Sequence, residues 1–302
     1  MAKLTIPREE LLIPGHMGCL GCGGALAMRY VLKALGKRTI VSVPACCWAI
    51  LSGIFPNTCL RVPMVNTAFE TTGASVSGIR AALDALGIED VNVLGWAGDG
   101  GTLDIGIQAL SGAVERGHNI IYVCYDNEAY MNTGIQRSSG TPEGAWTTTT
   151  PVGKTQAWKK GPKKNMVEIM VAHKIPYTAT ATVAYPEDLI KKVTKAKGIH
   201  GPKYIHVFAP CPTGWRMAPG KAVEISRLAV QTHAFPLYEV ENGIYHISKK
   251  PKQKPVMEYL KLQGRFKHMP QEMVDKFQKE IDREWELLIK KEEFTKSLYA
   301  GE

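Results

Sequence analysis

Two stretches of the chain decide the fold: Val91-Asn-Val-Leu-Gly-Trp-Ala-Gly-Asp-Gly-Gly-Thr-Leu-Asp104 and Ile120-Ile-Tyr-Val-Cys-Tyr-Asp-Asn-Glu-Ala129. Each begins with a short, nearly continuous apolar run, which is typical of a strand covered on both faces. Each run ends in glycines or polar residues, and a helical pattern at 103–116 separates the two. A strand, a crossing helix and a second strand form the repeating unit of a parallel sheet.

The same alternation continues along the first 210 residues. Further strands are predicted at 39–43, 177–182 and 204–208, and further helices at 25–35, 69–86, 167–173 and 186–197. The sequence therefore predicts an α/β fold with a doubly wound, mainly parallel sheet over residues 1–248. Residues 249–302 carry apolar side chains at helical spacing, which predicts a helical C-terminal extension that contacts another subunit.

Composition narrows the class of protein. The chain has 302 residues, 45% of them apolar, which is enough for a large buried core. We expect a cytoplasmic protein without membrane contact, because no long apolar run and no signal peptide are present. The net charge of +9 comes from a basic stretch at 154–164, expected to be an exposed loop, and from the extension. Since no base-reading motif accompanies these charges, we expect no nucleic-acid binding.

Oxygen-bearing residues follow both deciding strands, where ligands of a doubly wound sheet bind. The Asp99 carboxylate, the Asn127 amide oxygen and the Ala129 carbonyl would fill part of an octahedral Mg²⁺ shell, with diphosphate oxygens filling more. Neighbouring glycines let a diphosphate approach the backbone, and a helix starting near Leu103 would direct its N-terminus at the anion. By itself, however, a Gly-Asp-Gly tripeptide is more often a plain turn.

The chain contains seven cysteines, and an odd number in a cytosolic protein argues against a disulfide framework. Cys19 and Cys22 form a C-x-x-C pair flanked by glycines. This pair is compatible with half a zinc site, a redox dithiol or two of four ligands of an iron–sulfur cluster. Cys59 and Cys124 are predicted to be core residues.

Together these segments resemble the beta subunits of the pyruvate:ferredoxin oxidoreductases, within the 2-oxoacid:ferredoxin oxidoreductase family. The resemblance rests on five segments in the same order: Gly15 to Gly23, Gly98 to Asp104, Tyr125 to Gln136, Thr141-Pro142 and Ala209 to Trp215. It covers about residues 12 to 245 and leaves the C-terminal extension outside.

The resemblance implies two cofactors, thiamine diphosphate bound through Mg²⁺ and one [4Fe–4S] cluster. The residues implied to bind the coenzyme and its metal ion are Gly98, Asp99, Gly100, Gly101, Thr102, Asp104, Asn127 and Ala129. The implied cluster ligands are Cys19, Cys22, Cys47 and Cys211, with Cys46 as the alternative to Cys47. Asn132 and Thr133 are implied to hydrogen-bond the substrate.

The implied activity is oxidative decarboxylation of pyruvate with coenzyme A to acetyl-CoA and CO₂. Electrons would pass through the cluster to ferredoxin, or the reaction would run in reverse to make pyruvate. The alternatives are another short substrate such as oxalate or 2-oxobutyrate, a non-redox thiamine-dependent decarboxylase, and a zinc-stapled binding module.

The resemblance also implies partner subunits. No segment offers the domain that carries the coenzyme-activating glutamate in related enzymes. We therefore expect an anaerobic hetero-oligomer with alpha- and gamma-type subunits, a ferredoxin-like delta subunit, and soluble ferredoxin as electron acceptor.

Overall fold

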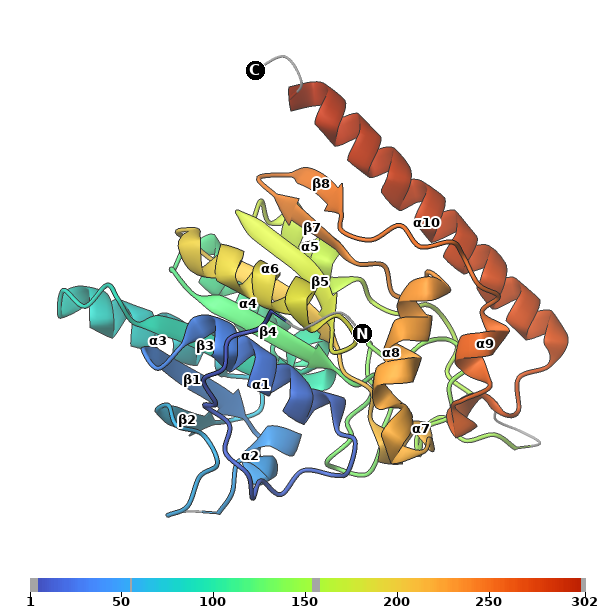
Figure 1. Ribbon diagram of the computed structural model, residues 1–302, viewed down its shortest axis with the longest axis horizontal. Helices are drawn as coiled ribbons and strands as arrows, with labels where there is room; N and C mark the ends of the chain where they lie inside the picture. The colour runs from blue at the N-terminus through green and yellow to red at the C-terminus, as the bar shows by residue number, and fades with distance from the viewer. Residues whose placement is uncertain (1–4, 55, 154–157, 300–302) are drawn as a thin grey trace.

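The computed structural model describes residues 5–54, 56–153 and 158–299, and Figure 1 shows a central sheet with helices on both faces. Within these residues the sheet has eight strands in the order β2-β1-β3-β4-β6-β5-β7-β8. Strands β1 to β6 run parallel, whereas β7 and β8 are antiparallel additions at one edge. The predicted doubly wound, mainly parallel sheet is confirmed.

All five predicted strands are present, and their ends agree within two residues. Three strands of four residues were not predicted, because runs this short carry little periodic signal. The strands are β1 (Thr39–Pro44), β2 (Met64–Thr67), β3 (Asn92–Gly98), β4 (Ile121–Asp126), β5 (Tyr177–Thr182), β6 (Lys203–Phe208), β7 (Tyr238–Glu241) and β8 (Ile244–Ile247).

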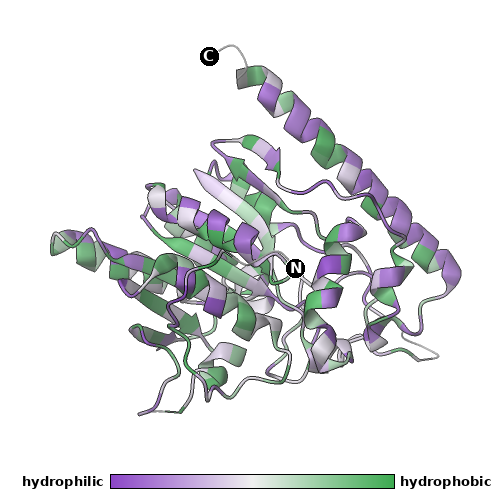
Figure 2. Ribbon diagram, viewed as in Figure 1, coloured by the Kyte–Doolittle hydropathy of each residue, from purple (hydrophilic) through white to green (hydrophobic). Residues whose placement is uncertain are grey.

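Helices cover both faces of the sheet, as a parallel sheet requires. One apolar cluster joins α1 (Gly23–Leu35) and α6 (Pro186–Gly198) to one face. Others join α3 (Thr72–Ala85), α4 (Ile107–Glu115) and α5 (Met166–Ala172) to the opposite face. Figure 2 shows how hydrophobic residues gather in the strands and on the inner sides of these helices. Across the described ranges, no helix combines the length and apolar character needed to cross a membrane.

The remaining helical elements lie in loops and in the C-terminal extension. They are α2 (Cys47–Leu51), η1 (Gly100–Asp104), α7 (Pro212–Trp215), η2 (Pro219–Lys221), α8 (Ala222–Gln231), α9 (Met257–Leu260), η3 (Gly264–Phe266) and α10 (Gln271–Tyr299).

The helix predicted from Leu103 begins later than expected. Residues 100–104 form the π-helical turn η1, and α4 starts only at Ile107. The backbone is tightly packed here, because a Cβ on Gly106 would lie 2.1 Å from the carbonyl oxygen of Gly101. The residues that follow β3 therefore form a wide turn rather than the first turn of a regular helix.

The C-terminal extension folds as predicted, and its long helix α10 runs beside the edge strand β8 (Figure 1). The Ile247 amide donates to Glu292 Oε1 at 2.9 Å, and the Tyr245 amide donates to Thr295 Oγ1 at 3.1 Å. These bonds satisfy backbone groups that an edge strand otherwise leaves exposed. Contact with another subunit stays a prediction.

Candidate functional site

The candidate site lies at the carboxyl ends of four neighbouring strands. In the sheet order β1, β3, β4 and β6 are adjacent, and their registers align Gly98 with Tyr125 and Asp126 with Phe208. The loops after these strands carry the Cys46-Cys47 doublet, Asp99, the segment 126–129 and Cys211. The topology thus brings all the predicted metal-binding segments except the C-x-x-C loop to one edge.

Three oxygen atoms converge between β3 and β4. Asn127 Oδ1 lies 2.9 Å from the Ala129 carbonyl oxygen and 2.9 Å from Asp99 Oδ1. Neither of these two partners accepts a hydrogen bond from any other described residue. The contact is favourable only if the amide is reversed, so that its nitrogen donates to both, or if a cation lies among the oxygens. These are the three predicted ligands of Mg²⁺.

Asp99 is completely buried, and only one of its oxygens has a hydroxyl partner. The Ser138 hydroxyl donates to Oδ2, which leaves Oδ1 directed at Asn127. Burial, reinforced by the charge of Asp126, raises the pKa of Asp99 well above its usual value. A carboxylate in this environment requires a positive partner to remain ionised.

Asp126 is also buried but has partners of its own. Its carboxylate forms an ion pair with Lys163, and its Oδ2 lies 2.8 Å from His206 Nε2. Burial opposes ionisation, but Lys163 and His206 outweigh it and hold the pKa of Asp126 below its usual value. Asp126 therefore already has its counter-charge, whereas Asp99 does not.

The glycine loop after Asp99 is shaped by its neighbours. A Cβ on Gly100 would lie 2.4 Å from the ring of Tyr130, so that ring packs directly on bare backbone. The Thr102 hydroxyl turns inward and donates to the Gly98 carbonyl at 2.8 Å. Asp104 Oδ2 accepts from the Tyr130 hydroxyl at 2.6 Å. The side chains of Thr102 and Asp104 thus support the loop, and their predicted role in binding the coenzyme stays a prediction.

Asn132 and Thr133 lie in an exposed turn after the segment 126–129, here called the metal loop. The Thr133 hydroxyl donates to Gln136 Oε1 at 2.6 Å. The described part of the chain does not enclose either side chain, so their predicted contact with substrate stays a prediction.

The loops that carry Cys22 and Cys211 lie side by side. The Gly23 amide donates to the Pro210 carbonyl at 3.0 Å, which joins the C-x-x-C loop to the loop of Cys211. This approach requires glycine, because a Cβ on Gly23 would lie 2.7 Å from Pro210 N. Burial and the nearby thiols of Cys22 and Cys19 raise the pKa of Cys211 to about 11.

The two neighbouring cysteines have different surroundings. Burial raises the pKa of Cys47, and the nearby sulfurs of Cys46, Cys211, Cys22 and Cys19 add to this effect. Burial also raises the pKa of Cys46, and the neighbouring Tyr125 opposes this rise. Which of the two cysteines is a cluster ligand stays a prediction. Among the described residues no three His, Cys, Asp or Glu side chains are close enough to hold one ion.

The helix α7 connects the two sites. It begins after Cys211 and ends at Trp215, whose indole Nε1 donates to the Asn127 carbonyl at 2.7 Å. A Cβ on Gly214 would lie 2.1 Å from the sulfur of Met131, so α7 also packs on the chain after the metal loop. Trp215 belongs to a segment that carried the family resemblance, but its role in holding Asn127 was not predicted.

The basic stretch is not the exposed loop that its composition predicts. Lys163 binds Asp126 and Glu128, and Lys159 is buried and donates to the carbonyls of Gly161 and Pro162 at 2.6 Å each. Lys154 lies outside the described residues. The missed signal is the acidic pair at 126 and 128, which needs cations once it is buried.

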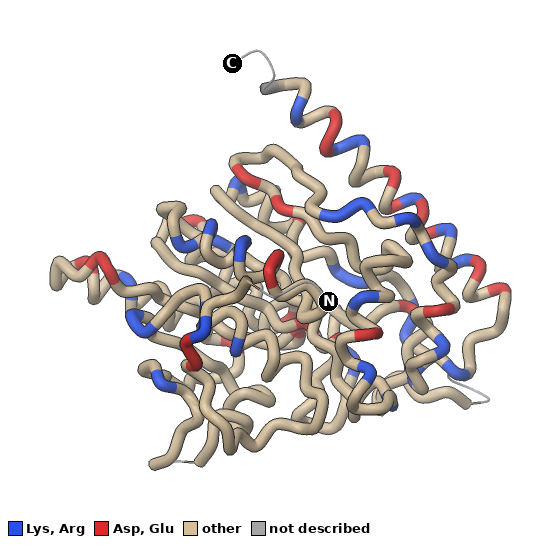
Figure 3. The backbone as a smooth tube through the Cα atoms, viewed as in Figure 1, with Lys and Arg blue, Asp and Glu red and all other residues tan. Residues whose placement is uncertain are grey.

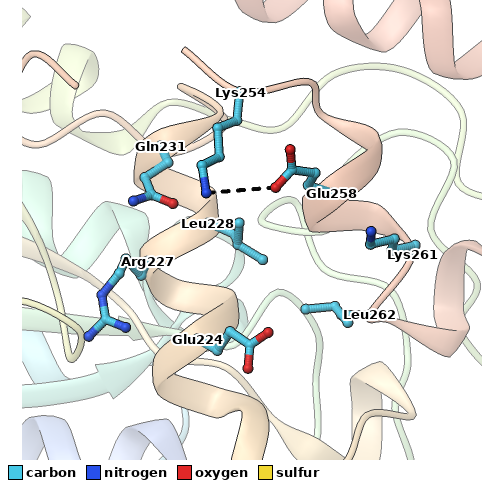
Figure 4. A pocket seen from close by; sticks show the side chains of 8 residues that line it. All are labelled: Glu224, Arg227, Leu228, Gln231, Lys254, Glu258, Lys261 and Leu262. Carbon is cyan, nitrogen blue, oxygen red and sulfur yellow. Dashed lines mark ion pairs between the residues drawn. The ribbon is translucent and has the colours of Figure 1, made fainter. Parts of the chain in front are cut away.

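Two cavities are found in the described part of the chain, and the second reaches Glu128, Lys163 and His206. Figure 4 shows one of about 350 Å³ between α8 and the segment 254–262, where Lys254 pairs with Glu258 at 3.7 Å. Another, of about 660 Å³, lies between the sheet, α5 and α10. Neither is lined by Asp99, Asn127 or a cysteine.

The fold and the converging oxygens define a domain of the thiamine diphosphate-binding class. Residues 49–207 match the family described as "Thiamine pyrophosphate enzyme, C-terminal TPP binding domain". The chain belongs to the beta subunits of the 2-oxoacid:ferredoxin oxidoreductases, so it is one subunit of a multi-subunit oxidoreductase.

This assignment rests on relatives that match nearly the whole chain. A ketoisovalerate oxidoreductase subunit VorB of Pyrococcus horikoshii is 57% identical over 95% of both chains. A pyruvate synthase subunit PorB of Methanothermobacter thermautotrophicus is 53% identical over 92% of this chain and 97% of its own. The match covers most of the C-terminal extension, which the sequence resemblance left outside.

A solved structure agrees with the fold. A 2-oxoglutarate:ferredoxin oxidoreductase from Magnetococcus marinus superposes with a TM-score of 0.58, covering 74% of this chain and 80% of the other at 20% identity.

Proposed function

We propose that this chain is the beta subunit of a pyruvate:ferredoxin oxidoreductase. The complex would convert pyruvate and coenzyme A to acetyl-CoA and CO₂, or run in reverse. When bound, thiamine diphosphate supplies the carbanion chemistry that releases CO₂ from a 2-oxo acid, and a [4Fe–4S] cluster supplies a one-electron acceptor.

The convergence of Asp99, Asn127 and Ala129 carries the metal part of this proposal. The Ala129 carbonyl oxygen and an oxygen of the wholly buried Asp99 carboxylate each lie 2.9 Å from Asn127 Oδ1, and such a set suits a hard divalent cation such as Mg²⁺. Asp99 and Asn127 would bind the ion from adjacent strands. The Ser138 hydroxyl would fix the orientation of the Asp99 carboxylate by donating to its other oxygen.

The rest of the coenzyme site comes from the loops on either side. The amides of the glycine loop at 98–101 would face the diphosphate, and the exposed turn at Asn132 and Thr133 would meet the substrate on the open side. There, each side chain would hydrogen-bond a carboxylate or keto oxygen as charge develops on it.

The mutual approach of Cys19, Cys22, Cys47 and Cys211 supports the cluster. Backbone amides point at two of the sulfurs: Ala25 N lies 3.4 Å from Cys22 Sγ, and Gly214 N lies 3.3 Å from Cys211 Sγ. Such N–H groups stabilise the negative charge of cluster thiolates.

The surface around the cysteines supports a partner subunit. Residues 11–28 and 39–60 contain no Lys, Arg, Asp or Glu, and Figure 3 shows few charged residues where α2 lies. Leu20 and Ile54 are 81% and 68% exposed on this uncharged face. An exposed apolar face of this kind marks a protein interface. We assign it to the alpha- and gamma-type subunits and the ferredoxin-like delta subunit of the complex, with soluble ferredoxin as final acceptor.

A branched 2-oxo acid, ketoisovalerate, is the second candidate substrate. Two relatives from Pyrococcus horikoshii allow a comparison in one organism. This chain is 57% identical to its ketoisovalerate oxidoreductase subunit VorB but 44% identical to its pyruvate synthase subunit PorB. PorB subunits of methanogens, however, reach 52–53% identity.

The test uses the complex isolated from its host without oxygen. Reduction of a viologen dye that depends on coenzyme A should be fastest with pyruvate, compared with ketoisovalerate, 2-oxobutyrate and oxalate. In the Asp99→Ala complex, coenzyme content and activity should fall by more than about 100-fold, because the only anionic metal ligand is lost. The visible absorbance of the cluster should persist.

Several outcomes would contradict the proposal. A preference for ketoisovalerate would move the assignment to the second candidate. Full coenzyme content in the Asp99→Ala complex would refute the metal site. Loss of coenzyme and cluster together would show that the two sites are not separate.

A further inference from the structure

We propose that Arg265, in the C-terminal extension, is a positioning residue for the metal loop, the segment Asp126 to Ala129. It acts through Glu128, which lies between the two metal-facing residues Asn127 and Ala129. This inference rests on the proposed Mg²⁺ site and adds to it a residue from a different part of the chain.

Glu128 is held in an unusual way. It has a φ of 67°, in the left-handed region that a residue with a side chain seldom adopts. It is 4% exposed, its carbonyl accepts from the Thr141 hydroxyl at 2.7 Å, and its amide donates to Asp126 Oδ1 at 3.0 Å. Because backbone strain persists only when the surroundings enforce it, the partners of Glu128 set the shape of the loop.

The carboxylate of Glu128 has two cationic partners from distant segments. Lys163 Nζ donates to Oε1 at 2.8 Å, and Arg265 donates to Oε2. Arg265 is 2% exposed, and Gln263 Oε1 fixes it further by accepting from its Nε at 3.0 Å. The buried charges are then balanced, because Lys163 and Arg265 match Asp126 and Glu128.

Arg265 also supports the loop by a second route. Its guanidinium carbon lies 3.9 Å from the centre of the Trp215 ring, and that indole donates to the Asn127 carbonyl. One side chain of the extension thus stabilises the residues on both sides of the Asn127–Glu128 peptide bond. Loss of Arg265 would leave the buried Glu128 carboxylate with Lys163 as its cationic partner and would remove the guanidinium that packs on the Trp215 ring.

Two possible roles of Arg265 predict opposite changes in Mg²⁺ affinity when the side chain is removed, which makes the inference testable. If Arg265 acted only through its charge, its removal would leave more negative charge beside the cation and tighten Mg²⁺ binding. If Arg265 positions the loop, the oxygens of Asn127 and Ala129 lose their alignment and Mg²⁺ binding weakens. Outer partners of metal ligands contribute about 10- to 100-fold to metal affinity, and we expect the lower end.

The experiment measures Mg²⁺-dependent binding of thiamine diphosphate to the complex stripped of both, followed by tryptophan fluorescence. In Arg265→Met, the Mg²⁺ concentration for half-saturation should rise about tenfold. At saturating Mg²⁺, kcat should stay near the wild-type value, because Arg265 touches no reacting atom. Arg265→Lys should recover part of the loss. The double variant Glu128→Gln/Arg265→Met, which leaves no unpaired charge, should recover more.

Lys276→Met is the matched control. Lys276 also joins the extension to the core, through Glu143 at 2.9 Å, but its side chain is 56% exposed. Its removal should leave Mg²⁺ binding unchanged.

Unchanged or tighter Mg²⁺ binding in Arg265→Met would overturn the inference, as would an equal effect in Lys276→Met. If Arg265→Met does not assemble, the double variant Glu128→Gln/Arg265→Met is compared with wild type instead. Tighter Mg²⁺ binding in the double variant than in wild type would contradict the positioning role. If the wild-type complex binds no thiamine diphosphate with Mg²⁺, the proposed function itself fails.

Discussion

At the scale of single residues, the cysteine doublet shows how orientation selects between neighbours of equal chemistry. Cys46 is the N-cap residue of the short helix α2 and Cys47 begins it. Burial raises the pKa of both, yet Tyr125 opposes this rise in Cys46, whereas the sulfurs of Cys22 and Cys211 add to it in Cys47. Tyr125 itself is held by stacking on Trp96, with ring centres 5.4 Å apart. We therefore expect Cys47, rather than Cys46 beside Tyr125, to bind the cluster.

A pair of conservative substitutions tests this selection. In Cys47→Ser, iron and acid-labile sulfide of the isolated complex should fall by at least half, because a hydroxyl is a poor substitute for a thiolate on iron. In Cys46→Ser, both should stay at wild-type levels. Loss of iron in Cys46→Ser with full retention in Cys47→Ser would reverse the assignment.

At the scale of elements, α10 is joined to the edge of the sheet by one carboxylate. Glu292 is 3% exposed and accepts from the Ile247 amide, Lys250 and Lys296. Burial opposes its ionisation, but these donors outweigh burial and lower the pKa of Glu292 to about 2. A carboxylate whose pKa is lowered on folding adds stability above its unfolded pKa, near 4.3, and loses this contribution as pH falls toward 2.

Hydrogen exchange of β8 amides measures this link between α10 and the sheet. Protection of the Ile247 amide should decline between about pH 5 and pH 2, after correction for the intrinsic exchange rate. In Glu292→Gln, protection should be lower at neutral pH, by on the order of 2 kcal/mol, and should depend less on pH. The neighbouring, exposed Glu293→Gln is the control and should match wild type. An unchanged pH profile in Glu292→Gln would refute the link.

At the scale of the whole molecule, charge and apolar surface are unevenly distributed. The net charge is +9, and α10 alternates charges of both signs along its length (Figure 3). Residues 11–28, which contain the C-x-x-C pair, include no Lys, Arg, Asp or Glu, and Leu20 among them is exposed. Such a division favours an enzyme whose charged side meets solvent and whose cysteine face meets another subunit.

Introducing a lysine at an exposed apolar position near the cysteines tests whether this surface is a subunit interface. Leu20→Lys should reduce co-purification of the partner subunits by more than about tenfold, because a buried unpaired lysine is costly at an interface. Leu86→Lys is the control, since Leu86 is 72% exposed at the end of α3, away from the cysteines. Equal recovery of partners with both variants would show that the cysteine face is not the interface.

The sequence by itself determined the alternation of strands and helices, and hence the sheet and the edge where ligands bind. Buried parallel strands leave a continuous apolar run, and turn residues such as those after Trp96 and Tyr125 mark where each run ends. The placement of Asp99 and Asn127 at that edge was predictable for the same reason, because each residue comes directly after a strand.

Only the tertiary structure decided which side chains support these residues. Ser138, Lys163, Trp215 and Arg265 reach the site from separate loops and from the C-terminal extension. No periodicity relates Arg265 to Glu128 across 137 positions of the chain. Their pairing follows from the need to neutralise charge in a buried loop, and that need arises only after the chain has folded.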